Sequence, residues 1–128
     1  LDLPVYIIRH YRRTGDELAV KRSVDEAVSY YYGLKSKTQT EKGGYILESL
    51  AARSYLEGGQ WQDGIDGLEK LIRDYPKNNP EEALLIKATI YLTRLHDKLK
   101  AKEELQKIIK EYPQSKLAKS AEVFLKKL

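Results

Sequence analysis

Hydrophobic residues recur along this chain at helical spacing, in runs that repeat every 37 residues. Tyr75-Pro76 and Tyr112-Pro113 lie 37 residues apart, and each dipeptide ends an amphipathic run. Aligning the runs gives a small residue followed by large residues at i+4 and i+7, which is one stripe of an α-helix. The small residue allows a second helix to approach closely. The three columns are Ala27, Gly64, Ala101; Tyr31, Leu68, Leu105; and Leu34, Leu71, Ile108.

A second amphipathic run precedes each of these helices. Apolar and small residues fall on one face in each run: Val5, Ile8, Gly15, Leu18; Leu47, Leu50, Ala51, Ser54; and Leu84, Ala88, Tyr91, Leu95. Pro4 and Pro80 suit the first turn of a helix, and Gly58-Gly59 can supply a left-handed residue after one. His96 occupies the column of Gly59, so it is expected at a tight turn. The pattern predicts an all-α fold without strands, with helical hairpins at about 4–39, 41–76 and 80–113 and a closing helix at 115–128.

The division of the first hairpin has two solutions. In the 37-residue register, residues 24–28 correspond to 61–65, and Ser23 with Glu26 forms a capping box that starts the second helix. Alternatively, the first helix ends at Gly15-Asp16, with Thr14 and Glu17 as the capping box. We favour the 37-residue register, and both divisions give seven helices. The segment 35–44 lacks apolar residues and has two glycines, which predicts a mobile loop.

At this point the sequence resembles the tetratricopeptide repeat family. The second repeat carries the family pattern most completely, with Gly in place of Ala at Gly64; its matching residues are Ala52, Tyr55, Gly59, Trp61, Gly64, Leu68, Leu71 and Pro76. The resemblance covers about residues 4–128. It implies a right-handed superhelical solenoid of antiparallel helix pairs, with three repeats and a C-terminal capping helix in a single domain.

The endings of two repeats, residues 74–78 and 111–115, look like the longer repeats of bacterial envelope proteins, such as outer-membrane assembly lipoproteins and Tol-Pal accessory proteins. This resemblance favours the periplasm or cell envelope, with the cytoplasm as an alternative. The chain has no Met, even at position 1, which predicts a piece of a longer protein.

Composition excludes several classes of protein. The longest apolar stretch near the start, residues 5–8, is far shorter than the roughly 20 residues of a transmembrane helix. With no Cys, the chain has no disulfide, thiolate nucleophile or Cys-ligated zinc. The hydrophobic fraction of 41% argues against wholesale disorder. What remains is a helical domain with a formal net charge of +4.

The sequence encodes no recognisable catalytic, metal or cofactor site. His10 and His96 are the only histidines, and neither has a second His at i+3 or i+4. The pairs Glu81-Glu82 and Glu103-Glu104 hold adjacent residues, which point about 100° apart on a helix and cannot converge on one substrate. We therefore interpret their negative charges as compensating the positive ends of helix dipoles at helix N-termini. Trp61 stands where the repeat needs an aromatic wedge. We therefore predict a protein that is not an enzyme and needs no cofactor.

The positive functional signal comes from arginines. Transferring the groove positions of the tetratricopeptide family selects first-helix residues, four of them Arg, that can pair with carboxylates of a partner. A surface that merely keeps the repeat soluble is the competing interpretation. The predicted groove consists of Arg9, Arg12, Arg53, Leu56, Ile86, Ile90 and Arg94.

These residues predict a non-catalytic scaffold that binds an acidic protein or peptide in the groove. One alternative is a self-association module, in which Phe124 and Leu128 of the last helix dock on another copy and form a homo-oligomer. Another is a nucleic-acid-binding helical repeat, but a net charge of +4 is weak support for it, so no nucleic acid is expected.

Overall fold

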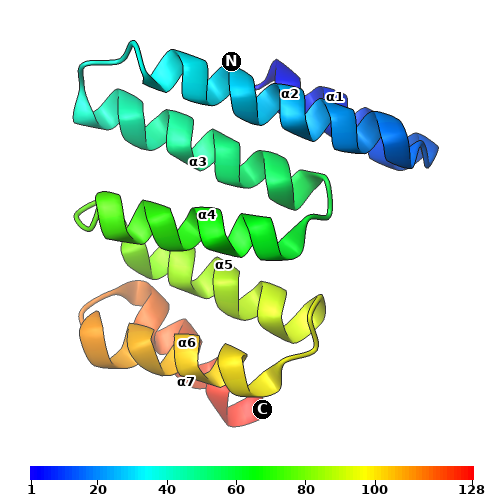
Figure 1. Cartoon of the computed structure of the whole chain (residues 1–128). Coiled ribbons are helices and arrows are strands. Elements are labelled where there is room, and N and C mark those ends of the chain that lie inside the picture. Colours follow the sequence, from blue (N-terminus) through cyan, green and yellow to red (C-terminus); the bar gives the residue numbers. More distant parts are fainter. The chain divides into compact units, whose positions relative to one another are not determined.

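Seven α-helices and no strand make up the protein (Figure 1), as the sequence predicted. The computed structural model describes all residues, 1–128. About 80% of them are helical. The helices are α1 (Leu3–Thr14), α2 (Glu17–Lys35), α3 (Glu41–Glu57), α4 (Trp61–Asp74), α5 (Pro80–Thr93), α6 (Lys98–Glu111) and α7 (Lys116–Lys127).

The chain forms two compact units. The N-terminal unit, Leu1–Leu71, holds α1 to α3 and most of α4. The C-terminal unit, Ile72–Leu128, holds the last residues of α4 together with α5, α6 and α7. Within each unit, consecutive helices pack side by side, α2 against α3 in the first and α5 against α6 in the second.

Side chains at the helix starts satisfy backbone N–H groups that have no partner inside the helix. Asp16, Thr40, Asp97 and Ser115 each accept a hydrogen bond from a backbone N–H two or three residues further on. Pro4 and Pro80 lie at the starts of α1 and α5, as predicted. The turns between paired helices also match expectation, because Gly59 and His96 are both left-handed, with φ of 75° and 52°.

The favoured division of the first hairpin is wrong, and the alternative boundary at Gly15-Asp16 is the one observed. Gly15 is left-handed, with φ of 79°, and ends α1, while Asp16 caps α2 through the N–H of Ala19. Ser23 and Glu26 therefore lie inside α2 and form no capping box, and Thr14 is not the cap of α2 either. Leu18 belongs to α2 and is 83% exposed.

The predicted loop 35–44 is shorter than expected. The connection between α2 and α3 ends at Thr40, whose side chain accepts a hydrogen bond from the Gly43 N–H. Gly43 and Gly44 lie in the first turn of α3, and Gly44 is buried. Glycine here serves close packing, since a Cβ on Gly43 would collide with the Thr38 side chain.

The core of the N-terminal unit gathers apolar residues from its helices. Tyr31 is fully buried and donates a hydrogen bond to the Leu1 carbonyl, 2.7 Å away. In the pair α3 and α4, the backbones approach at small residues, because a Cβ on Gly67 would lie 3.0 Å from the Cβ of Ala52. The apolar core cluster comprises Val5, Ile8, Val24, Ala27, Val28, Tyr31, Leu47, Leu50 and Ala51.

Replacing Ala52 with Leu is expected to lower the free energy of unfolding by about 1–3 kcal/mol, because the larger side chain meets the α4 backbone at Gly67. Urea denaturation followed by circular dichroism measures the loss. Leu18→Ala is the matched control on an exposed residue and should change the free energy of unfolding by less than about 0.5 kcal/mol. An unchanged midpoint for Ala52→Leu would mean that α3 and α4 have room to separate.

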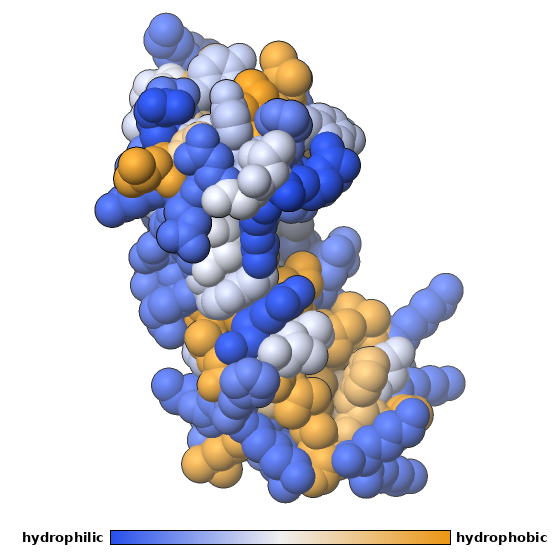
Figure 2. Space-filling model, turned by 90° about the vertical axis from the view of Figure 1, so that its right-hand side faces the viewer, coloured by the Kyte–Doolittle hydropathy of each residue, from blue (hydrophilic) through white to orange (hydrophobic).

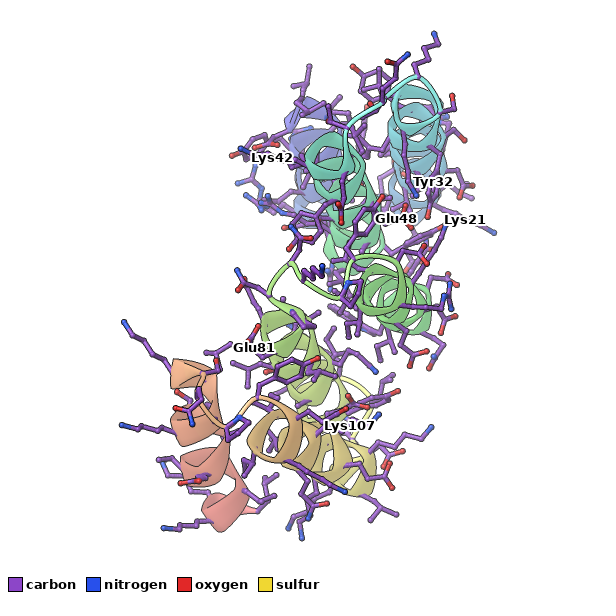
Figure 3. All side chains as sticks on the ribbon, turned by 90° about the vertical axis from the view of Figure 1, so that its left-hand side faces the viewer. Lys21, Tyr32, Lys42, Glu48, Glu81 and Lys107 are labelled. Atoms are coloured by element: carbon purple, nitrogen blue, oxygen red, sulfur yellow. The ribbon has the colours of Figure 1, made fainter.

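A buried carboxylate joins three helices of the N-terminal unit. Glu48 on α3 is 1% exposed, and its two oxygens pair with Lys35 Nζ of α2 at 2.7 Å and Lys70 Nζ of α4 at 3.1 Å. Tyr32 Oη donates a third bond to Glu48, 3.2 Å long, and the two side chains lie beside each other in Figure 3. Burial, with the charge of Glu48, raises the pKa of Tyr32 to about 12.

The C-terminal unit also contains a buried ion pair. Lys87 Nζ of α5 lies 3.3 Å from Glu104 Oε1 of α6, and both residues are buried. The interpretation of Glu103-Glu104 as compensation of a helix N-terminus is therefore wrong for Glu104, since this residue lies in the second turn of α6 and faces Lys87. Around this pair, the apolar cluster contains Leu84, Ala88, Leu105, Ile108, Ala118 and Ala121.

Candidate functional site

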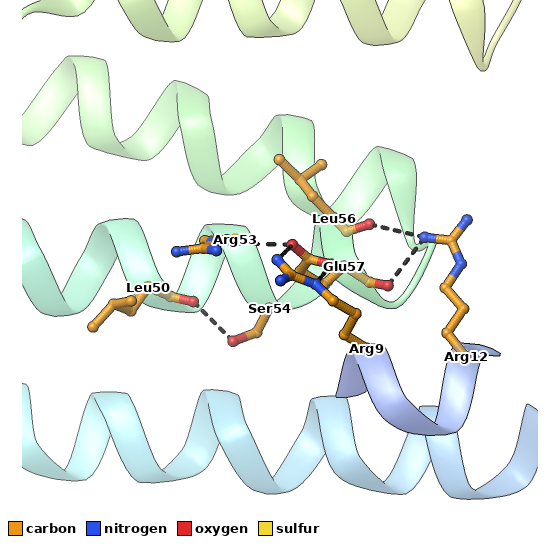
Figure 4. A network of polar contacts seen from close by, with 7 residues as sticks. All are labelled: Arg9, Arg12, Leu50, Arg53, Ser54, Leu56 and Glu57. Carbon is orange, nitrogen blue, oxygen red and sulfur yellow. Dashed lines mark hydrogen bonds and ion pairs between the residues drawn. The ribbon is translucent and has the colours of Figure 1, made fainter. Parts of the chain in front are cut away.

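Two of the predicted groove arginines, Arg9 and Arg53, meet at one carboxylate in the N-terminal unit, and a third, Arg12, binds the backbone of the same residue. Arg9 of α1 donates two hydrogen bonds to Glu57, from Nη2 to Oε1 at 2.6 Å and from Nε to Oε2 at 3.2 Å. Arg53, one helical turn before Glu57 on α3, brings its Nε to 3.8 Å from Oε1. We call Arg9, Arg12 and Arg53 the arginine cluster, with Glu57 at its centre (Figure 4).

Arg12 closes the C-terminal end of α3. Its Nη1 donates to the last two carbonyls of the helix, those of Leu56, at 3.4 Å, and Glu57, at 3.0 Å; the Leu56 carbonyl also accepts the Gly59 N–H. The guanidinium also lies 5.2 Å from the centre of the Trp61 ring, within the range of a cation–π contact. Arg12 thereby joins the end of α1 to the turn between α3 and α4.

The electrostatics of the cluster follow from these contacts. The hydrogen bond from Arg9 is the main cause that holds the pKa of Glu57 below its ordinary value, and the charges of Arg9, Arg53 and Arg12 add to it against the opposite effect of partial burial. The same bond raises the pKa of Arg9 above its ordinary value. Glu57 thus stays ionised and neutralises part of the charge that the sequence assigns to the groove.

A hollow of about 570 Å³ lies beside the cluster. Its lining includes Arg12 of α1 and Trp61 of α4, and α2 contributes Val20 and Lys21. The turn glycines Gly58 and Gly59 also line it. One acidic residue, Glu17, and two basic residues, Arg12 and Lys21, line this hollow. The hollow offers an arginine, a lysine and an aromatic face to a bound side chain.

The other predicted groove residues divide by unit. Leu56 is half-buried in the N-terminal unit, against Gly64 of α4. In the C-terminal unit, Ile86 is 37% exposed, Ile90 is only 6% exposed, and Arg94 is exposed at the end of α5. Ile90 therefore has little surface to offer, whereas Ile86 and Arg94 present theirs to solvent.

Sequence reasoning missed Glu57. The groove positions taken from the family pattern include Leu56 but not Glu57. Glu57 lies four residues after Arg53, a spacing at which opposite charges meet on a helix, and this signal could have paired the two residues. The bond to Arg9, 48 residues away, has no local signal.

No group of three or more His, Cys, Asp or Glu side chains is placed to hold a metal ion. None of the helices combines the length and the apolar character needed to cross a bilayer.

Comparison with known proteins gives one family. A family model described as tetratricopeptide repeat matches residues 49–78 and 82–115. Each match takes in most of a first helix and the whole of the second helix that follows it, α3 with α4 and α5 with α6. No curated protein and no solved structure matches the chain significantly.

Proposed function

Since the chain belongs to the tetratricopeptide repeat family, we propose that it is a non-catalytic scaffold that binds an acidic segment of a partner protein through its first-helix residues. Repeats of this family generally serve as scaffolds for protein interactions. The acidic character of the ligand and the residues that meet it are our proposal. The observation that carries it is the arginine cluster.

Glu57 supports this proposal by example. It is a carboxylate bound by the guanidinium of Arg9 and approached by that of Arg53, so the cluster already has the geometry that recognises an acidic side chain. Arg53 is 44% exposed, and the two bonds from Arg12 use one nitrogen of a group with five N–H donors. A ligand carboxylate that approaches Arg12 and Arg53 therefore meets donors while Arg9 stays with Glu57.

Charge alone does not define the ligand. Each exposed ion pair is worth about 0.2–1 kcal/mol, so a few pairs together raise affinity several-fold to about a hundredfold. Apolar side chains of the ligand need contacts as well, and Trp61 in the lining of the hollow offers one such contact.

Reversing the charge of Arg53 is expected to weaken partner binding about three- to tenfold, because it replaces a donor at the cluster by a carboxylate next to Glu57. Peptides selected from a random displayed library on the parent protein serve as probes. Fluorescence anisotropy at two salt concentrations measures their affinity, which should fall as salt screens the charges. The selected peptides should be enriched in Asp and Glu.

The matched control is Arg22→Glu, which makes the same change at an exposed position of α2 and should leave affinity within about twofold. A stronger effect of Lys127→Glu on these peptides would favour the alternative, docking through the last helix. Selected peptides without excess acid, or affinity that ignores salt, would remove the groove proposal.

The cellular setting rests on resemblance alone. The endings of the second and third repeats look like those of bacterial envelope proteins, and we propose the cell envelope as the compartment on that ground.

A further inference from the structure

The C-terminal unit contains an apolar hollow that shares no residue with the predicted groove. Its volume is about 140 Å³, and nearly all of its lining is apolar. The space exists because α7 packs mainly on α6 and touches α5 at few points. We call it the C-terminal hollow; it is lined by Leu85, Ala88, Thr89, Leu92 and Thr93 of α5, Ala101 and Leu105 of α6, Phe124 of α7, and Leu128 directly after α7.

The walls of this hollow are arranged as in a groove that receives a helix. The α5 residues follow the spacing of one helical face, and Phe124 of α7 and Leu128, four residues further on, add apolar side chains to the lining. Phe124 remains 50% exposed, although it is large and apolar. In Figure 2, hydrophobic residues gather on the visible face of the C-terminal unit, with hydrophilic side chains around them.

The segment that contributes α6 and α7 to the hollow is strongly basic. Residues 98–128 hold nine Lys and four Glu, a net charge of +5, whereas residues 1–97 hold 14 basic and 15 acidic side chains, a net charge of −1. The net positive charge of the chain thus comes entirely from residues 98–128. Lys127 is adjacent to Leu128, and Lys100 lies 5.6 Å from the ring of Tyr91, which neighbours Leu92.

We propose that the C-terminal hollow binds an acidic amphipathic helix of a partner protein. Apolar side chains at i, i+3 or i+4, and i+7 of that helix insert between α5 and α7, and its Asp and Glu residues face the lysines. This surface is separate from the arginine cluster, which lies in the other unit. The chain therefore offers two binding surfaces that both favour acidic partners but differ in the ligand shape they accept.

A second copy of the chain fits this hollow less well. A symmetric dimer places the same surface of each copy against the other. Two basic segments, each with a net charge of +5 over residues 98–128, would then come together, and like charges across an interface oppose association. The predicted self-association through Phe124 and Leu128 is therefore disfavoured by charge.

The shape of the hollow also argues against a membrane or a nucleic acid. A helix that binds a bilayer surface projects its apolar side chains outward, whereas here they line a depression between helices. Binding of single-stranded nucleic acid relies on aromatic platforms, and Phe124 is the one aromatic residue among the lining residues.

Designed helical peptides of about 18 residues test the proposal. The probe has Leu at i, i+3 and i+7 and Glu or Ala elsewhere; one reference peptide replaces every Glu with Lys, and another has a central Pro that breaks the helix. In fluorescence anisotropy the Glu probe should bind the full chain and both references should not. Phe124→Asp and Thr89→Trp, which fills the hollow from an exposed position, should each weaken binding about tenfold or more.

Charge variants give the matched comparison. Lys127→Glu should weaken binding of the Glu probe about three- to fivefold, while Lys110→Glu, at an exposed position of α6 outside the hollow, should not. Arg53→Glu should leave it unchanged, which separates this site from the arginine cluster. Circular dichroism confirms that each variant is folded.

Two results with the peptides would overturn the proposal: the Lys reference binds as well as the Glu probe, or Thr89→Trp does not change the affinity for the Glu probe. A dimer of the chain that Phe124→Asp dissociates would identify a second copy as the occupant. Binding to vesicles with phosphatidylserine that depends on Phe124, without binding of the Glu probe, would identify a membrane.

Discussion

Replacing Lys87 with Met is expected to lower the free energy of unfolding by about 3–5 kcal/mol, because it leaves a buried carboxylate without its counterion. The side chains of Lys87 and Glu104 are only 5% and 7% exposed. Glu104 Oε2 has no hydrogen-bond partner, so the carboxylate depends on what its other oxygen receives. Lys107 is a weak substitute, since its Nζ lies 3.8 Å from Oε1 and its side chain is 53% exposed.

Two further variants decide whether the loss comes from the unpaired charge. The double variant Lys87→Met, Glu104→Met removes both charges and should recover most of the loss, because an apolar pair of similar volume often equals a buried ion pair. Lys107→Met should cost less than about 1 kcal/mol. Urea denaturation measures all three. A double variant no more stable than the single one would show that packing around Lys87, rather than the charge of Glu104, sets the stability.

Glu48→Ala has the second largest expected effect, a loss of about 2–4 kcal/mol in the free energy of unfolding. The carboxylate holds lysines from α2 and α4 and accepts the Tyr32 hydroxyl bond, so its removal takes three contacts from the junction of three helices. The loss is smaller than for Lys87 because the lysines left behind are 26% and 38% exposed and can turn to solvent.

Tyr32→Phe is the control for Glu48→Ala, because it removes one bond to Glu48 and keeps both ion pairs. It should cost about 1 kcal/mol. If Glu48→Ala costs no more than Tyr32→Phe, the two lysines contribute nothing to stability and Glu48 acts only as a hydrogen-bond acceptor.

Periodicity was sufficient to predict the helices, but not where the first two divide. Trp61 starts α4, and Glu17 starts α2 44 residues earlier, which is one repeat of 37 plus seven residues. Seven residues make about two helical turns, so the apolar column through Ala27 and Tyr31 keeps its face and hides the shift. Gly15 and Asp16 carried the decisive information as a left-handed cap and an N-cap.

The long-range polar contacts could not be predicted from the sequence, for a different reason. Glu48, Glu57 and Glu104 look like ordinary charged helix residues, and which of them is buried depends on the helix that packs over each one. The arginines of the cluster were identified as groove residues, but their common partner Glu57 was not. A carboxylate that binds an arginine 48 residues away is specified by tertiary packing alone.

The left-handed residue at position 96 also bears on how such hairpins are recognised. His96 adopts the same backbone handedness as Gly59, although it carries a side chain, and His is among the residues that tolerate this region better than most. The turn is thus fixed in conformation and degenerate in sequence. A scan that demands glycine between the paired helices would pass over α5 and α6, while one that weighs the apolar columns would find both pairs.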